Sequence, residues 1–303
     1  MQTELNHPSA YKDEMLHITL SDGYVRGLLL TATHTVAKAA AIHHTSPVAT
    51  AALGRTLMGT AMMAAMLKEE EQSVTVTLDG GGPLGKVLCV GEEGAVRGYV
   101  ENPALEMPLR PDGKLSVGAA VGKDGFLTVV KDLNMKAPYI GRVQMLSGEV
   151  AEDFAGYYVQ SEQQPTLQSL GVLVGGEAVL SAGGVLLQPL PGCPEEVISQ
   201  LELRSPLMAD ISRELCYEPM ESLMGKWFDG LKPVLLSRTP LSYQCRCSRR
   251  RMEKALISLG KAELTRMIED EQEGAELTCH FCHKTEKFTQ QDLSRLLSEA
   301  VNP

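Results

Sequence analysis

The chain has 303 residues, and its 44% apolar content is enough for a sizeable core and favours two domains over one. Its 28 Lys and Arg against 38 Asp and Glu give a net charge of −10, which argues against general affinity for nucleic acid or an anionic membrane. The first residues carry no secretory signal, and the apolar stretch 48–67 contains Arg55 and two glycines. We therefore expect a cytoplasmic protein, whose seven cysteines are reduced thiols, metal ligands or redox sensors.

Residues 1–192 are predicted to form one large mixed domain of the α+β class. Residues 16–30 resemble two strands on either side of a Ser-Asp-Gly turn. Ser46 and Pro47 are favourable as N-cap and first helical residue, and the Ala-, Leu- and Met-rich run that follows predicts a largely buried helix.

Further strands are expected later in this domain. Residues 74–78 alternate with the period of a strand and end in a Gly-rich loop. Residues 170–187 predict more strands, with tight turns at the two glycine pairs, Gly175-Gly176 and Gly183-Gly184.

Residues 193–243 differ in composition from the first domain and are interpreted as a helical linker region. Prolines are frequent, and short amphipathic pieces at 195–203 and 220–231 are each expected to form a helix; the second contains Trp227, the only tryptophan. A segment that is apolar but interrupted by proline cannot fold alone. We expect it to rest on a neighbouring domain.

Residues 244–303 are predicted to form a small third unit. Only 14 large apolar side chains occur there, too few for a robust core in 60 residues. A helix is expected over 252–268. Such a unit usually needs a covalent or metal crosslink, and its cysteines can provide one.

Two close cysteine pairs carry the clearest chemical signal of the chain. Cys245 and Cys247 are separated by 31 residues from Cys279 and Cys282. Two such pairs around a helical stretch in a cytosolic chain indicate one zinc ion held by four thiolates. His280 and His283 flank this complete set, and we interpret them as neighbours of the site.

The Cys-x-Cys spacing matters for redox chemistry. A zinc tetrathiolate holds its sulfurs roughly 3.8 Å apart, whereas a disulfide needs about 2.05 Å. Metal-bound and oxidised states therefore exclude each other, and zinc keeps the thiolates deprotonated and open to an oxidant. Arginines around the first pair can offset the charge of the site: Arg246, Arg249, Arg250 and Arg251.

Other interpretations are weaker. The arginines also fit a zinc ribbon that binds nucleic acid, but residues 244–303 carry ten basic and ten acidic residues, whereas such modules are normally basic. Residues 79–86 resemble a phosphate-binding loop, yet Val87 follows Lys86 where a Ser or Thr belongs. A turn between strands is the better interpretation. No catalytic arrangement of side chains stands out, so we expect a protein that is not an enzyme.

The sequence 245–251, Cys-Arg-Cys-Ser-Arg-Arg-Arg, together with Cys279-His-Phe-Cys282, resembles the heat-shock protein 33 family of redox-regulated bacterial chaperones. Further segments resemble the core signatures of that family: 51–56, 82–85, 96–100, 125–130, 147–149, 152–154 and 182–184. Two positions depart from the family pattern. Arg250 replaces an acidic residue and Glu286 replaces an aromatic one, and both changes concern contacts around the site and not its ligands.

The resemblance implies an ATP-independent holdase that is zinc-bound and inactive when reduced. Oxidation would form Cys245–Cys247 and Cys279–Cys282, release zinc and unfold the small unit. The linker would then lose its support and expose apolar surface to unfolded client proteins, the oxidised form being a homodimer. A dithiol oxidoreductase using Cys279 and Cys282 is an alternative, as is the nucleic-acid-binding zinc ribbon.

A helix of the linker is expected to cover the client-binding surface in the inactive form. We expect residues 220–231 to cover part of the first domain when zinc is bound. Four apolar side chains of this piece are the candidates for client binding: Leu223, Met224, Trp227 and Phe228.

Overall fold

The structure is a computed structural model that describes residues 11–69, 71–270 and 274–301. The chain divides into two compact units, with the boundary between Gln244 and Cys245, so that residues 193–243 belong to the first unit. The mixed α and β architecture predicted from the sequence is confirmed. Among the described residues, no helix combines the length and apolar character that a membrane crossing requires.

Five antiparallel strands make the first sheet within the described part of unit 1, in the order β10-β1-β2-β9-β8. Their bounds are β1 Glu14–Leu20, β2 Val25–Thr31, β8 Leu167–Gly175, β9 Ala178–Pro189 and β10 Val234–Pro240. The expected hairpin of β1 and β2 is confirmed. Its connection, a short 3-10 turn at Ser21–Gly23, places Asp22 and Gly23 at positive φ, which glycine adopts without strain.

The expected turn at Gly175-Gly176 is confirmed, but the second turn, at Gly183-Gly184, is wrong. Both of these glycines lie inside β9 and pair with β2 and β8. A Cβ on Gly183 would lie 2.2 Å from the Leu215 side chain, and one on Gly184 would lie 2.7 Å from Leu170. Glycine is present here because neighbouring elements approach the strand closely, and not because the chain turns.

The second sheet contains six described strands in the order β11-β5-β4-β3-β6-β7. They are β3 Ser73–Asp79, β4 Val87–Glu92, β5 Ala95–Val100, β6 Phe126–Asp132, β7 Tyr139–Gln144 and the short β11 Ser242–Tyr243. All pair antiparallel except β11, which runs parallel to β5. Residues 80–86 connect β3 to β4, so the phosphate-loop resemblance was correctly interpreted as a turn between strands.

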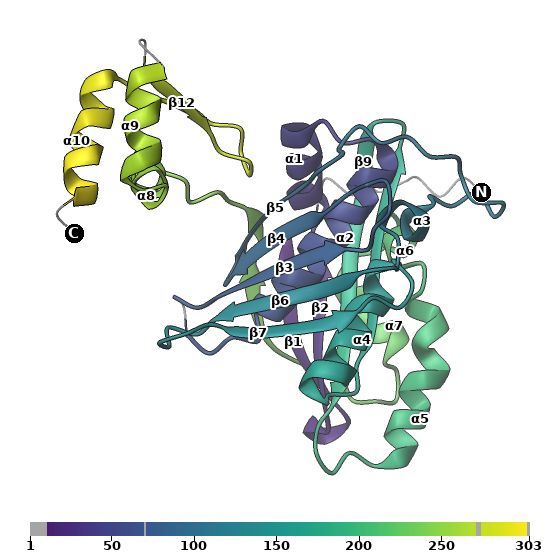
Figure 1. Cartoon of the computed structure of the whole chain (residues 1–303). Coiled ribbons are helices and arrows are strands. Elements are labelled where there is room, and N and C mark those ends of the chain that lie inside the picture. The colour runs from purple at the N-terminus through teal and green to yellow at the C-terminus, as the bar shows by residue number, and fades with distance from the viewer. Residues whose placement is uncertain (1–10, 70, 271–273, 302–303) are drawn as a thin grey trace. The chain divides into compact units, whose positions relative to one another are not determined.

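The helix α2 (Pro47–Ala64) lies between the two sheets and packs on β4 and β5 on one side and β8 on the other (Figure 1). All of its residues except Pro47 and Arg55 are buried, as the sequence predicted. The Ser46 hydroxyl caps it by accepting a hydrogen bond from the Ala49 N–H at 3.3 Å. The remaining helices of this half are α1 Thr33–His43, α3 Val117–Val121 and α4 Val150–Glu162.

The opposite face of the first sheet is covered by the linker helices. These are α5 Glu195–Arg204, a 3-10 turn Ser205–Met208, α6 Ile211–Glu214 and α7 Met220–Trp227. Their buried side chains form one apolar cluster with those of β1, β2 and β9. We call this set the linker cluster. Its buried members are Leu16, Ile18, Leu20, Val25, Leu29, Val185, Leu187, Leu201, Met208, Ile211, Leu215, Met220, Leu223, Trp227, Phe228 and Leu231.

The second unit contains α8 Arg249–Ser258, α9 Lys261–Asp270, the hairpin β12 Ala275–Thr278 and β13 Thr285–Phe288, and α10 Gln290–Val301. The single helix predicted over 252–268 is wrong. Gly260 takes φ +86° between α8 and α9, a conformation that ends a helix and that glycine accepts most easily. Among the described residues, the buried core of this unit is small: Met252, Leu256, Leu264, Ala275, Phe288, Leu293 and Leu296.

Candidate metal centre

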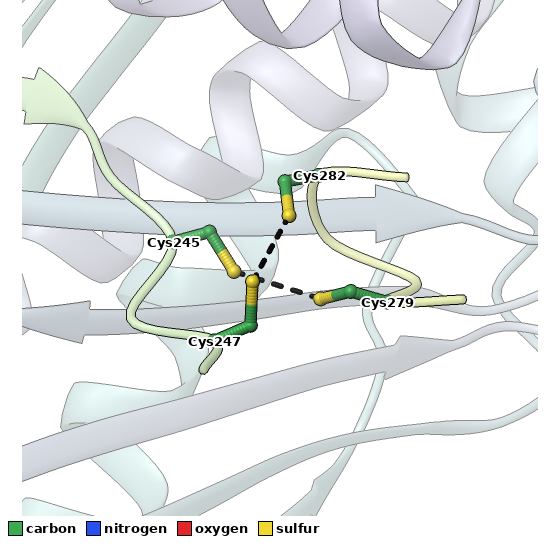
Figure 2. Close-up of side chains that lie close together, drawn as sticks. All are labelled: Cys245, Cys247, Cys279 and Cys282. Carbon is green, nitrogen blue, oxygen red and sulfur yellow. Dashed lines mark hydrogen bonds between the residues drawn. The ribbon is translucent and has the colours of Figure 1, made fainter. Parts of the chain in front are cut away.

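The first cysteine pair lies in a short loop that leads into a capped helix. Cys245 and Cys247 follow β11, and Ser248 is the N-cap of α8, where its hydroxyl accepts a hydrogen bond from the Arg251 N–H at 3.3 Å. The cap fixes the chain direction immediately after Cys247. The spacing of one residue between the cysteines brings both sulfurs to one side of this loop (Figure 2).

The second pair lies in the loop of the β12–β13 hairpin. The Cys279 N–H donates to the Lys284 carbonyl at 3.0 Å, and the His283 N–H donates to the Cys279 carbonyl at 2.8 Å. His283 takes φ +55°, which closes the loop. Strand pairing and these two hydrogen bonds hold Cys279 and Cys282 on the same short loop.

The four sulfur atoms converge on one point, although the two loops are more than thirty residues apart in the chain. All four Sγ atoms lie within 4.8 Å of one another, with 3.6 Å between Cys245 and Cys279 and 3.3 Å between Cys247 and Cys282 (Figure 2). These separations exceed a disulfide bond of about 2.05 Å and are close to the roughly 3.8 Å of sulfurs around a tetrahedral metal ion. The four cysteines are therefore able to hold a metal ion.

The other metal-ligand side chains lie outside this cluster. His280 and His283 are exposed and do not belong to the group of ligand atoms within 4.8 Å, as expected from the sequence. Cys89 and Cys216 are buried in unit 1, and Cys193 is half-buried. Within the described residues, only the four cysteines of unit 2 form a possible metal-binding group.

The electrostatics around the four thiols disfavour four negative charges. Burial raises the pKa of the Cys247 thiol and, to a lesser degree, that of Cys245. Burial also acts to raise the pKa of Cys282, but the Lys284 backbone N–H and the neighbouring thiols outweigh it, so that the pKa of Cys282 is lowered. A bound cation would remove this conflict, because it stabilises thiolates that are otherwise desolvated and close to one another.

Arg249, the first residue of α8, contacts β13 and α10 in ways that the sequence did not indicate. Its guanidinium donates to the Lys287 carbonyl at 2.7 Å, pairs with Asp292 at 2.9 Å and lies 4.4 Å from the Phe288 ring centroid. Glu286 lies 3.6 Å from it and pairs with Lys284 at 2.7 Å. We expected Arg249 to offset thiolate charge, but its charge faces carboxylates. Arg249 and Asp292 are 43 residues apart in the chain, so no local pattern reveals this contact.

The departures from the family pattern have different surroundings. Glu286 takes part in the ion pairs described above, whereas Arg250 is exposed on the first turn of α8. The pKa of Glu286 is lowered, mainly by its hydrogen bond with Lys284.

The four candidate client-binding residues lie in unit 1, away from solvent. Leu223, Trp227 and Phe228 are at most 3% exposed, and Met224 is partly buried against the same linker cluster. The rings of Trp227 and Phe228 meet edge to face with centroids 6.4 Å apart. The expectation that α7 rests on the first domain is therefore confirmed, and these side chains are covered in this conformation.

Comparison with known proteins places the chain in a family. A family model described as Hsp33 protein matches residues 13–289. The chain belongs to the Hsp33 family. It is 44% identical to a 33 kDa chaperonin of Alkaliphilus metalliredigens, covering 94% of this chain and 98% of that protein. A 33 kDa chaperonin of Clostridioides difficile is 39% identical, with 95% and 99% covered.

A solved structure supports the same assignment. The crystal structure of the 33 kDa chaperonin (heat shock protein 33 homolog) of Thermotoga maritima matches with a TM-score of 0.87 and 32% identity. The match covers 97% of this chain and all of that one. Membership in the Hsp33 family and the names of these relatives support a chaperone function.

Proposed function

We propose that this member of the Hsp33 family is a redox-regulated, ATP-independent holdase of the cytoplasm. One zinc ion per chain is held by Cys245, Cys247, Cys279 and Cys282 in the reduced, inactive form. The observation that carries the proposal is the convergence of four thiols in a unit whose described core contains only seven buried apolar side chains.

The free energies support metal-dependent folding of this unit. Structural zinc contributes about 10–16 kcal/mol of apparent folding free energy in small modules, whereas a core of this size contributes only a few kcal/mol. Zinc supplies charge that holds the four sulfurs as thiolates. Loss of the ligand set should therefore unfold the unit even if Arg249 keeps its ion pairs.

The proposed switch is the oxidation of the ligands. In each disulfide two thiolates give up two electrons to one peroxide, which takes up two protons and leaves as two waters. We propose the pairs Cys245–Cys247 and Cys279–Cys282. The short sulfur contacts run between the loops and not within them, but four sulfurs around one centre are nearly equidistant, so these contacts select no pairing.

The proposed output is the linker cluster. Residues 193–243 connect through Gln244 to Cys245, so unfolding of unit 2 frees the chain immediately after this segment. Release of α5–α7 would uncover one face of the first sheet together with Leu223, Met224, Trp227 and Phe228. Unfolded client proteins would bind this apolar surface. We propose that the oxidised form is a homodimer.

The test measures zinc and holdase activity in one sample, before and after peroxide. A chromogenic chelator reports zinc, and light scattering reports aggregation of heat-unfolded luciferase. We expect one zinc per chain and no protection in reductant, followed by zinc release and protection after peroxide. The double variant Cys279→Ser and Cys282→Ser should lack zinc and protect the client without peroxide.

The matched control is Cys193→Ser, which removes a thiol outside the cluster and should behave as the unmodified protein. Failure of the double variant to protect the client would contradict the proposal. Peroxide-independent, salt-sensitive binding of nucleic acid would favour the zinc ribbon instead. Turnover of disulfides by a zinc-free protein would favour the dithiol oxidoreductase.

A further inference from the structure

Residues 234–244 form a strap that belongs to both sheets of unit 1. Strand β10 is the edge strand of the first sheet beside β1, and β11 is the edge strand of the second sheet beside β5. Between them the Leu241 N–H donates to the Asp13 carbonyl at 2.9 Å. The strap is therefore held along its length, and its last residue, Gln244, precedes the first metal-ligand cysteine.

Tyr243 is the buried end of this strap. It is 2% exposed, and its hydroxyl donates to the Gly98 carbonyl at 2.9 Å and lies 3.1 Å from His43 Nε2. The rings of Tyr243 and His43 meet edge to face with centroids 6.4 Å apart. The Gln244 N–H then donates to the Val96 carbonyl at 3.0 Å. A ring, a hydroxyl and two backbone hydrogen bonds, Gln244 with Val96 and Ser242 with Gly94 at 3.1 Å, thus fix the last three residues before Cys245.

We propose that Tyr243 anchors the strap to unit 1, so that the linker is released only after a delay that follows metal loss. This inference rests on the proposed function. Unfolding of unit 2 frees the chain from Cys245 onward, but fraying into unit 1 must first extract Tyr243. Extraction leaves the Gly98 carbonyl without this donor and removes the ring from its contact with His43. The strap therefore persists for a time after the metal site is lost.

Release of the strap is the step that frees the linker helices. Strand β10 follows α7 by only a few residues, and its hydrogen bonds with β1 hold the C-terminal end of the linker on the first sheet. While Tyr243 stays buried, α5–α7 remain tethered at both ends. Once it leaves, β10 can detach from β1 and α7 loses its second attachment.

The test compares Tyr243→Phe with a matched control, Tyr158→Phe. The Tyr243 change removes the bonded hydroxyl and keeps the ring. The Tyr158 hydroxyl is also buried in unit 1 but lacks a hydrogen-bond partner among the described residues, so its loss should have little effect. After peroxide, each protein is followed by zinc release, by proteolytic cleavage between 195 and 240, and by hydrogen exchange of the Ser242 and Gln244 amides.

In the unmodified protein we expect zinc release first, with the Ser242 and Gln244 amides losing protection later, together with linker cleavage. Tyr243→Phe should release zinc at the same rate but shorten the delay before cleavage about two- to tenfold, the range for one hydrogen bond. Tyr158→Phe should keep the original delay.

An unchanged delay in Tyr243→Phe would overturn the anchor, as would equal shortening in the control. If Tyr243→Phe does not fold, hydrogen exchange of the unmodified protein still decides: loss of strap protection at the same moment as zinc release refutes the proposal. Failure of the proposed function looks different, because the unmodified protein would then bind no zinc or gain no holdase activity.

Discussion

Trp227→Ala tests whether the linker cluster holds the protein inactive. Trp227 is 3% exposed, belongs to the linker cluster and contacts Phe228 edge to face. Truncation of a buried tryptophan costs about 3–5 kcal/mol, part of it from the cavity that remains. If this cost falls on the state in which the linker is packed on the first sheet, the equilibrium constant for linker release increases roughly a hundredfold to a few thousandfold.

The variant should therefore protect an aggregating client in excess reductant while its zinc remains bound, because the ligands in unit 2 are unchanged. Light scattering of heat-unfolded luciferase and zinc content are measured in the same sample. Leu203→Ala is the matched control, since Leu203 lies on α5 in the same linker but is 79% exposed. Leu203→Ala should change the free energy of unfolding by no more than about 0.5 kcal/mol.

Two results would refute this reasoning. A Trp227→Ala protein that stays inactive in reductant and needs as much peroxide as the unmodified protein shows that α7 does not restrain activity. Equal activation by Leu203→Ala shows that any change in the linker suffices and that burial of Trp227 is not the cause.

Three further predictions concern the metal site, the oxidised state and the core. Replacing His280 and His283 by alanine should leave one zinc per chain, because both side chains are exposed and lie outside the sulfur cluster; loss of most zinc would overturn the all-sulfur assignment. Limited proteolysis should cut residues 195–303 only after oxidation and spare 11–192, and equal protection of both forms would contradict oxidative unfolding. Burial raises the pKa of Asp153, so the folded state binds this proton more tightly than the unfolded state. The free energy of unfolding, measured in urea, should therefore rise relative to that of Asp153→Asn as the pH falls towards the ordinary carboxyl pKa of about 3.9. A difference between the two proteins that does not change with pH would argue against a raised pKa of Asp153.

The sequence alone determined the local elements and identified the four cysteines that cluster in unit 2. The strands at 16–30 and 74–78, the capped helix after Ser46 and the four cysteines follow from short-range patterns of polarity, capping and spacing. Such patterns act within a few residues, so they are visible without knowledge of the fold. The resemblance to the Hsp33 family, confirmed by the comparisons, rests on the two cysteine motifs and on short segments of the first domain.

The tertiary structure decided the features that depend on contacts between distant residues. The sequence predicts a turn at Gly183 and Gly184, but both residues lie inside β9. Glycine occurs there because Leu215 and Leu170 leave no room for a side chain. The two-helix break at Gly260 depends on a backbone conformation that composition does not reveal. The contacts of Arg249 with Asp292 and of Tyr243 with Gly98 join positions 43 and 145 residues apart. The packing of sheets and helices against one another determines these partners, and no local sequence pattern specifies that packing.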